Sequence, residues 1–409
     1  MLPETLTWLQ SPEGQAVLAD LEARAISETD TLRELTRLRA SHTPEQARAA
    51  IEQTVLRQRA RAKLEHADRL YFTREALEQA SSTPIARYRA QRFVGYQHIL
   101  DVGCGIGGDA LELAMAGDNT RQVTAIDRDA ERVALATANA VALALQQRLR
   151  VVQADVLANP AALPPADALF CDPGRRSGGR RRFHIEQYEP PLSVVLGWRS
   201  NGPTIAALAV KLAPGVDTAE LDNLLHDPYE LEFISLDGAL KEAVLWCGPL
   251  ATPAIARRAT LLHTQHSAIA TLTPATPRPR PPLHDPAAIL YEPDPAIIRA
   301  GLVAELAALL GAAQLDREIA YLTAAHYQPS PFARAWAIHE WHPFNLKRLR
   351  ARLRDLNVGA VTVKKRGSPL DTDQLARQLS SNGSQPLLVV LTQRNGRPII
   401  LIGAPVPLA

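Results

Sequence analysis

The stretch DVGCGIGGDALELA, which begins at Asp101, carries four glycines within six positions. Gly103, Gly105 and Gly108 have the G-x-G-x-x-G spacing of dinucleotide-binding loops, whereas Gly103, Gly105 and Gly107 behind Asp101 give D-x-G-x-G-x-G. Residues without a side chain let a ligand approach the backbone closely. Both spacings indicate a loop that holds a cofactor, but they imply different chemistry.

Two acidic residues follow the next strand-like runs. Asp127 ends VTAID, 19 residues after Gly108, where a carboxylate can accept hydrogen bonds from ribose hydroxyls. Asp155 follows VVQA and suits the exocyclic amine of an adenine, although an Asp at this place can instead cap a helix. Together they predict an adenosine-containing ligand without naming it.

The segment CDPGRRSGGRRRFH, which begins at Cys171, joins an acid to a dense group of arginines. Five arginines within eight residues repel one another unless an anion lies among them. A nucleic-acid phosphate is the natural candidate, and a solvated basic loop is the alternative. The predicted substrate-binding arginines are Arg175, Arg176, Arg180, Arg181 and Arg182.

Short apolar runs that alternate with helical patterns surround these residues. They predict a parallel sheet covered by helices on both faces. ELEFISL and ALKEAVLWC flank Asp237-Gly238, a dipeptide typical of hairpins, so these two strands are expected to be antiparallel. A further strand is expected near 257–263. The other expected strands are HILDV, QVTAID, LRVVQADV, ALFCDP and TIAALAVKLAP.

The chain of 409 residues is long enough for two or three domains. In the last part of the chain we expect a helix over 295–315 and a hairpin through Asn395-Gly396. The expected parts are a helical region over 1–95, the strand–helix alternation over 96–270, a proline-rich linker over 271–286 and a smaller α+β domain over 287–409.

The composition, 46% hydrophobic and 22% charged, is that of a globular protein. A formal net charge of +2 excludes bulk attraction to nucleic acid, so any basic site must be local. Cys104, Cys171 and Cys247 lie far apart without metal-ligand spacing, so no metal site is expected. No signal-peptide pattern or 18-residue apolar run occurs, and a cytoplasmic protein without membrane contact is expected.

Taken in order, these motifs resemble the class I S-adenosylmethionine-dependent methyltransferases over about 96–250. Those enzymes have D-x-G-x-G-x-G, an acid after strand two, an acid after strand three, a motif after strand four and an antiparallel last strand. The resemblance implies a Rossmann-like α/β fold with a seven-stranded sheet, and S-adenosylmethionine as the cofactor. The cofactor-binding residues it implies are Asp101, Gly103, Cys104, Gly105, Gly107, Asp127, Arg128, Asp155 and Val156.

The motif after strand four implies the methyl acceptor. In methyltransferases that act on base amines, an acid or amide here accepts from the amine and an aromatic residue stacks on the flipped base. Asp172 and Pro173 match and are the predicted catalytic residues, whereas Gly174 and Arg175 replace a second proline and the aromatic. Arg175 or Phe183 could stack instead.

Tyr88 and Arg89, just ahead of the glycine loop, are also predicted to bind the substrate. The lead-in LYFTREALEQASSTPIARYRAQRF, the DPGRR motif and the tail resemble bacterial class I methyltransferases with a C-terminal THUMP-like domain. THUMP domains are associated with RNA-modifying enzymes, although they usually precede the catalytic domain. The resemblance therefore implies transfer to a base nitrogen of tRNA or rRNA.

Two other functions remain open from the sequence. One is a methyltransferase for a protein or small molecule, with the tail as a docking module. The other is a non-catalytic RNA-binding protein that retains a cofactor pocket. An oxidoreductase explains neither Asp172-Pro173 nor the terminal hairpin.

Overall fold

The computed structural model divides into two compact units, one of residues 1–230 and 242–254 and one of residues 231–241 and 255–409. The residues that the structure describes are 3–159, 163–174, 176–177, 180–181, 184–201, 205–264, 269–368, 370–380 and 383–406.

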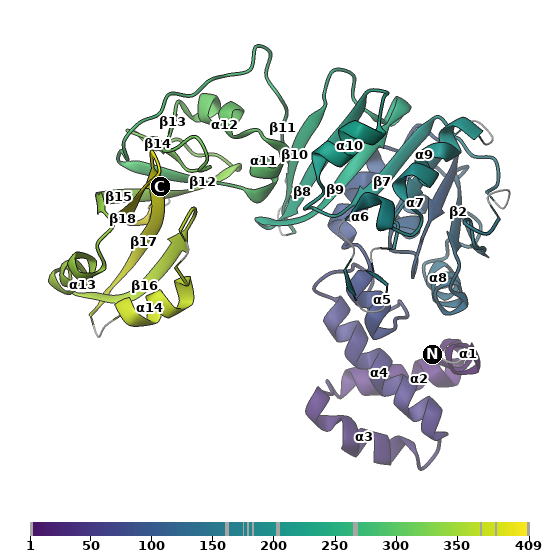
Figure 1. Ribbon diagram of the computed structural model, residues 1–409. Coiled ribbons are helices and arrows are strands. Elements are labelled where there is room, and N and C mark those ends of the chain that lie inside the picture. Colours follow the sequence, from purple (N-terminus) through teal and green to yellow (C-terminus); the bar gives the residue numbers. More distant parts are fainter. Residues whose placement is uncertain are drawn as a thin grey trace. The chain divides into compact units, whose positions relative to one another are not determined.

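The first unit begins with helices whose ends follow from local sequence. Ser11 and Thr43 cap helices that start with a proline, and Thr43 forms a reciprocal capping box with Gln46. Thr73 caps α5 through its hydroxyl, which accepts from the backbone N–H of Ala76. The elements are α1 (Pro3–Gln10), α2 (Pro12–Ala23), the 3-10 turn η1 (Glu28–Asp30), α3 (Thr31–Leu38), α4 (Pro44–Ala60), α5 (Arg74–Gln79) and α6 (Thr83–Gln91) (Figure 1).

A parallel sheet follows, as expected from the strand–helix alternation. Its strands lie in the order β7-β4-β1-β2-β3, and β9 pairs antiparallel with β7. The strands are β1 (His98–Val102), β2 (Gln122–Asp127), β3 (Leu149–Gln153), β4 (Ala168–Cys171), β7 (Ala207–Leu212) and β9 (Ala239–Cys247).

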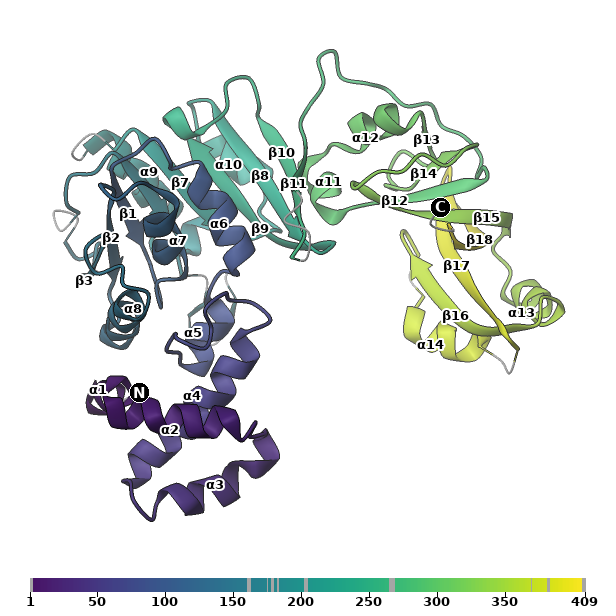
Figure 2. The same cartoon turned by 180° about the vertical axis from the view of Figure 1, so that it is seen from behind.

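Helices cover both faces of this sheet. Helices α6 and α7 pack against each other on one face, and α9 and α10 lie over the other (Figures 1 and 2). This is the predicted class I methyltransferase fold. The helices and short turns after β1 are α7 (Gly108–Ala116), α8 (Ala130–Ala142), η3 (Ile185–Gln187), α9 (Leu192–Asn201), α10 (Thr218–Leu224) and η4 (Gly248–Leu250).

The register of the parallel strands brings the predicted site residues to one edge of the sheet. In β1, Val102 pairs with Ile126 of β2 and with Cys171 of β4. The residues that follow these strands therefore emerge together at the carboxyl edge, where ligands bind in open α/β sheets.

The second unit contains most of β8 (Tyr229–Leu236), from Leu231 on, which pairs in parallel with β10 (Arg257–Leu262). Strand β11 (Ile269–Leu272) pairs antiparallel with β10. Asp237 and Gly238 both have positive φ, 52° and 76°, as the predicted two-residue hairpin requires. The Asn395-Gly396 hairpin is also confirmed, because Arg394 pairs with Arg397.

A separate seven-stranded sheet has the order β13-β14-β12-β15-β18-β17-β16, and α13 and α14 pack on one face of it. Its elements are β12 (Ile289–Pro293), α11 (Pro295–Ala300), α12 (Val303–Leu310), β13 (Ala313–Gln314), β14 (Leu322–Ala324), β15 (Ala333–Pro343), α13 (Leu346–Asp355), β16 (Val358–Lys365), α14 (Thr372–Leu379), β17 (Gln385–Arg394) and β18 (Arg397–Pro405).

The single helix expected over 295–315 is wrong. Two short helices, α11 and α12, form instead, because Gly301 adopts φ 71° and ends the first. Gly311, with φ 58°, ends the second.

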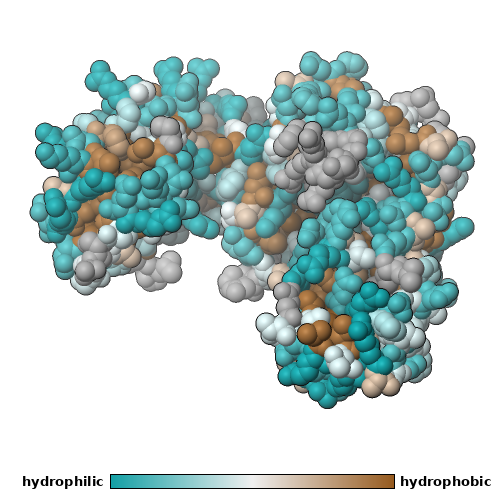
Figure 3. Space-filling model, turned by 60° about the horizontal axis from the view of Figure 1, so that its bottom comes forward, coloured by the Kyte–Doolittle hydropathy of each residue, from teal (hydrophilic) through white to brown (hydrophobic). Residues whose placement is uncertain are grey.

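On the face shown in Figure 3, hydrophilic residues predominate and hydrophobic residues form separate patches among them. Over the described part of the chain, no helix is long and apolar enough to cross a membrane.

Candidate active site

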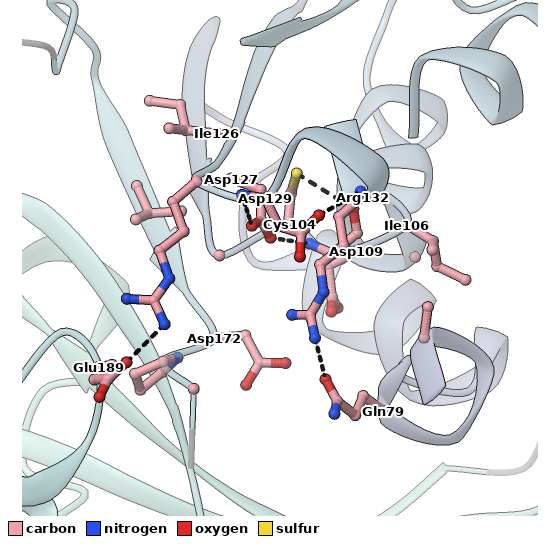
Figure 4. A pocket seen from close by; sticks show the side chains of 18 of the residues that line it. Gln79, Cys104, Ile106, Asp109, Ile126, Asp127, Asp129, Arg132, Asp172 and Glu189 are labelled. Carbon is pink, nitrogen blue, oxygen red and sulfur yellow. Dashed lines mark hydrogen bonds and ion pairs between the residues drawn. The ribbon is translucent and has the colours of Figure 1, made fainter. Parts of the chain in front are cut away.

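A cavity of about 360 Å³ lies at the carboxyl edge of the first unit's sheet. The loops after β1, β2, β3 and β4 form most of its wall, and the segment from Glu75 to Ser81 completes it. Figure 4 shows Asp127, Arg132, Gln79, Asp172 and Glu189 around this space.

The backbone of the glycine loop packs closely against neighbouring backbone at Gly103 and is open at Gly105. Gly103, Gly105 and Gly107 have φ values of 79°, 55° and 86°, which favour glycine. A Cβ on Gly103 would stand 2.5 Å from the carbonyl oxygen of Asp172, whereas a Cβ on Gly105 would stand in open space. Gly103, Cys104 and Gly105 line the cavity; Gly107, the N-cap of α7, is not among its described lining residues.

Asp127 is buried at the cavity wall and braces the glycine loop. Its Oδ2 accepts a hydrogen bond from the backbone N–H of Gly105 at 2.9 Å, and its Oδ1 accepts from that of Asp129 at 3.0 Å. A carboxylate oxygen can accept a second hydrogen bond, so this arrangement leaves acceptor capacity for a ligand. The neighbouring Arg128 also lines the cavity and pairs with Glu189 at 2.8 Å.

Asp155 and Val156 line the cavity after β3, as expected for the adenine side. The Oδ1 of Asp155 accepts from the backbone N–H groups of Leu157 at 2.9 Å and Ala158 at 3.2 Å. The two bonds close a turn over 156–158, so the helix that Asp155 could have capped does not begin here among the described residues. The turn occupies one carboxylate oxygen of Asp155.

Asp101 lies beneath the loop with no exposed surface, and neither carboxylate oxygen has a hydrogen-bond partner. Burial, together with the nearby carboxylates of Asp109 and Asp172, raises the pKa of Asp101 well above its ordinary value. Burial, together with the carboxyl groups of Asp101 and Asp127, also raises the pKa of the Cys104 thiol. Burial therefore favours the protonated forms of Asp101 and Cys104 relative to a free carboxyl group and a free thiol.

Asp172 is the predicted catalytic residue, and its side chain lines the cavity with Pro173. Lys211, at the end of β7, donates to Oδ2 of Asp172 at 2.7 Å. The same ammonium group donates to the hydroxyl of Ser81 at 3.0 Å. Although burial lowers it, the pKa of Lys211 is raised, because Asp172, Glu242 and Asp109 surround it.

Arg89, predicted to bind the substrate, is 2% exposed and does not reach the cavity. Its guanidinium pairs with Asp109 of α7 and Glu242 of β9 and donates to Ser81 at 2.9 Å. The nearby cations lower the pKa of Asp109, although burial opposes them. The prediction for Arg89 is thus corrected: helix α6 packs on α7, so the guanidinium faces the protein interior and is unavailable to a substrate.

The segment that carries the predicted arginines, 175–182, follows Gly174 at the cavity rim, where the chain is paired with itself. The backbones of Gly174 and Glu189 exchange two hydrogen bonds, of 2.7 and 2.9 Å, and between them β5 (Arg176–Ser177) pairs antiparallel with β6 (Arg180–Arg181). The predicted Arg175, Arg182 and Phe183 lie outside the described residues, as do the side chains of Arg176, Arg180 and Arg181. Tyr88 is half-buried on α6, away from the described cavity wall.

Several residues of the site are not among those predicted from the sequence. Lys211 was the most accessible to prediction, because it is a cation within ALAVKL, an otherwise apolar strand that is buried throughout. Ser81 and Asp109 gave no comparable signal. Gln79 and Arg132, which hydrogen-bond at 3.0 Å across the rim, lie 53 residues apart.

Comparison with known proteins gives matches in three segments. Residues 99–173 match a methyltransferase domain, 333–405 a THUMP domain-like model, and 3–60 a domain of unknown function, DUF8688. Over 350 residues the chain is 38% identical to an uncharacterised S-adenosylmethionine-dependent methyltransferase of Mycobacterium tuberculosis, an alignment that covers 84% of this chain and 92% of that protein. The chain belongs to the S-adenosylmethionine-dependent methyltransferases.

Two further similarities are informative about the fold and about a short segment of the chain. A crystal structure from Porphyromonas gingivalis W83, of a protein described as a methyltransferase candidate, superposes with a TM-score of 0.74 at 21% identity. It covers 93% of this chain and all of its own, and it supports the fold. A tRNA1(Val) (adenine(37)-N6)-methyltransferase of Klebsiella pneumoniae is 44% identical over 62 residues, 15% of this chain and 25% of that protein.

The site of this methyltransferase fits the cofactor that its family uses. S-Adenosylmethionine has no phosphate, and its sulfonium is cationic. The described residues that line the cavity contain no lysine, and the carboxylates of Asp127, Asp155 and Asp172 face the same space. The open position beside Gly105 is the cradle that a Cβ would fill.

Proposed function

We propose that this methyltransferase modifies a ring or exocyclic nitrogen of a base in tRNA or rRNA, with Asp172 orienting the acceptor nitrogen. The observation that carries the proposal is the placement of Asp172. Its carboxylate stands in the cavity wall beside the glycine loop, one oxygen is bound by Lys211, and Pro173 follows it. Asp-Pro at this place is typical of methyltransferases that act on base amines.

We assign the cofactor contacts to the described cavity wall. The backbone of the Gly103–Gly105 loop would lie along the bound cofactor, and Asp127 would accept hydrogen bonds from its ribose hydroxyls. The Oδ2 of Asp155, which binds no backbone N–H among the described residues, would accept from the adenine amine. The backbone N–H of Val156 would donate to the adenine ring. The supporting residues are Asp101 beneath the loop, Cys104 in the wall, Gly107 at the start of α7 and Arg128 at the rim.

S-Adenosylmethionine supplies an electrophilic methyl group on a cationic sulfonium. When the cofactor is bound, the acceptor nitrogen would gain this methyl group and the C–S bonding pair would remain on the sulfur. Asp172 orients the acceptor nitrogen by accepting a hydrogen bond from its N–H. After the methyl group is transferred, the proton of that nitrogen goes to Asp172 or to water. Most of the rate enhancement comes from this positioning, because the methyl donor is already activated.

Four observations support RNA as the substrate. An arginine-rich segment leaves the cavity rim directly after Asp172, where a phosphate could balance its charge. The THUMP domain-like match over 333–405 and the partial similarity to a tRNA methyltransferase point the same way. In the second unit, α13 also carries the exposed basic residues Lys347, Arg348 and Arg350.

The test is transfer of labelled methyl from S-adenosylmethionine to cell extract, before and after nuclease or protease treatment. Label is expected in the nuclease-sensitive fraction. Asp172→Ala should lower kcat by about 100-fold or more with little change in cofactor affinity. Asp127→Ala should instead lose cofactor binding, and the exposed Asp373→Ala is the matched control.

Label found only in protein or small molecules would replace the RNA proposal with the second hypothesis. An Asp172→Ala enzyme with normal turnover would refute the role of Asp172. RNA binding should also weaken steeply as salt rises. A salt-insensitive complex would contradict phosphate recognition by the arginine segment.

A further inference from the structure

Lys211 is a charged residue where the fold calls for an apolar one. It belongs to β7, whose six residues are all buried, and it is 6% exposed. Burial of an ammonium group is costly unless anions and acceptors compensate for it. Its position follows from the strand register: Cys171 of β4 pairs with Val210 of β7, so Asp172 and Lys211 emerge side by side.

The hydroxyl of Ser81 completes the arrangement around Lys211. It accepts from Lys211 at 3.0 Å and from Arg89 at 2.9 Å, and it donates to Asp109 at 2.9 Å. A hydroxyl has one donor and two acceptor positions, so all three are used and the direction of its proton is fixed. Ser81 thus gives Lys211 a second fixed partner besides the carboxylate of Asp172.

We propose that Lys211, held by Ser81, is a positioning residue that fixes the Asp172 carboxylate in a single orientation for the methyl acceptor. Lys211 occupies Oδ2 of Asp172. No other side chain among the described residues makes a hydrogen bond to Asp172, so Oδ1 is the oxygen presented to the acceptor nitrogen. Without the ammonium group the carboxylate rotates about its χ angles and loses that geometry.

This inference rests on the proposed role of Asp172, and the effect should appear in catalysis rather than in cofactor binding. Lys211→Met should lower kcat about 100-fold, the scale expected for a misplaced group, with unchanged affinity for S-adenosylmethionine. Ser81→Ala, which removes no charge, should lower kcat about fivefold, as expected for the loss of one neutral hydrogen bond. Lys241→Met, on the exposed start of β9, is the matched control.

A double-mutant cycle separates positioning from a general structural role. If Lys211 acts through Asp172, Lys211→Met should have almost no further effect on kcat in an Asp172→Ala background. An equal effect in both backgrounds would overturn the proposal. So would a normal kcat in Lys211→Met while Asp172→Ala is impaired. If Lys211→Met does not fold, Lys211→Gln and Ser81→Ala enter the same cycle.

The cycle is run on whichever fraction of the extract accepts label, so failure of the RNA proposal leaves it intact. Normal turnover of Asp172→Ala would instead refute the proposed role of Asp172 and this inference together. If no fraction accepts label, the orientation of the Asp172 carboxylate is compared in crystal structures of Lys211→Met and the wild type. A carboxylate displaced from its wild-type orientation supports the proposal, and an unchanged one overturns it.

Discussion

The two glycines that flank Cys104 should respond differently to the same substitution. Both have positive φ, so alanine at either place is strained by roughly 1–2 kcal/mol. At Gly103 the new Cβ would also meet the carbonyl oxygen of Asp172 at 2.5 Å, which forces the loop and the end of β4 apart. Overpacking of this kind adds about 1–3 kcal/mol.

Gly103→Ala should therefore lower the free energy of unfolding by about 2–5 kcal/mol, and Gly105→Ala by only about 1–2 kcal/mol. Cofactor binding should be affected at Gly105, although the loss of stability there is the smaller one. The new Cβ on Gly105 would stand in open space at the cavity wall, where it can obstruct the cofactor. Gly105→Ala should weaken binding of S-adenosylmethionine by more than tenfold, about 1.4 kcal/mol, in a folded protein.

The assays are urea unfolding without cofactor and calorimetric titration with S-adenosylmethionine. Gly215→Ala is the control, because its Cβ also meets nothing within 4 Å and it lies away from the described cavity wall. Equal stability of the two loop variants would refute the tight contact between Gly103 and Asp172. Wild-type affinity in Gly105→Ala would refute the placement of the cofactor along the loop.

Two further predictions concern the buried charges. Arg89→Met removes the guanidinium that pairs with the buried Asp109 and Glu242 and should lower the free energy of unfolding, measured in urea, by about 3–5 kcal/mol. Arg48→Met, at a pair in which both Arg48 and Glu45 are exposed, should cost under about 1 kcal/mol, and equal losses would contradict the buried network. The raised pKa of Asp101 means that the folded state holds this proton more tightly than the unfolded chain, so stability falls as pH rises above about 4. Asp101→Asn removes this dependence. The melting temperature of the variant minus that of the wild type, both measured without cofactor, should therefore increase from pH 5 to pH 8. A difference that stays constant would refute the raised pKa of Asp101.

The elements that sequence reasoning predicts best are those specified locally. The glycines of the loop, Asp127 at the end of β2 and the Asp237-Gly238 turn each depend on a few neighbouring residues. Parallel strands then bring their carboxyl ends to one edge, which places Asp127, Asp155 and Asp172 around one cavity. Local pattern and one topological rule are enough for this part of the site.

The charge network beneath the site depends on contacts distant in sequence. Arg89 and Glu242 are 153 residues apart, and Lys211 and Asp172 are 39 apart. Arg89 was predicted to face a substrate because it is close to the loop in sequence and basic. Burial of α6 against α7 decided its direction, and periodicity alone does not specify which face of a short helix carrying several arginines becomes buried.

Asn139 shows why the helical N-terminal region matters for the site. It is fully buried in α8, its Oδ1 accepts from the N–H of Tyr71 at 2.7 Å, and its Nδ2 donates to the carbonyls of Tyr71 at 3.2 Å and Ile106 at 3.0 Å. Ile106 belongs to the glycine loop, so one amide joins the segment before α5 to the cofactor site. Ser81 makes a second such connection, to Lys211. The lead-in segment is thus part of the site itself, since removing it would take Ser81 away from Lys211 and Tyr71 away from the amide of Asn139.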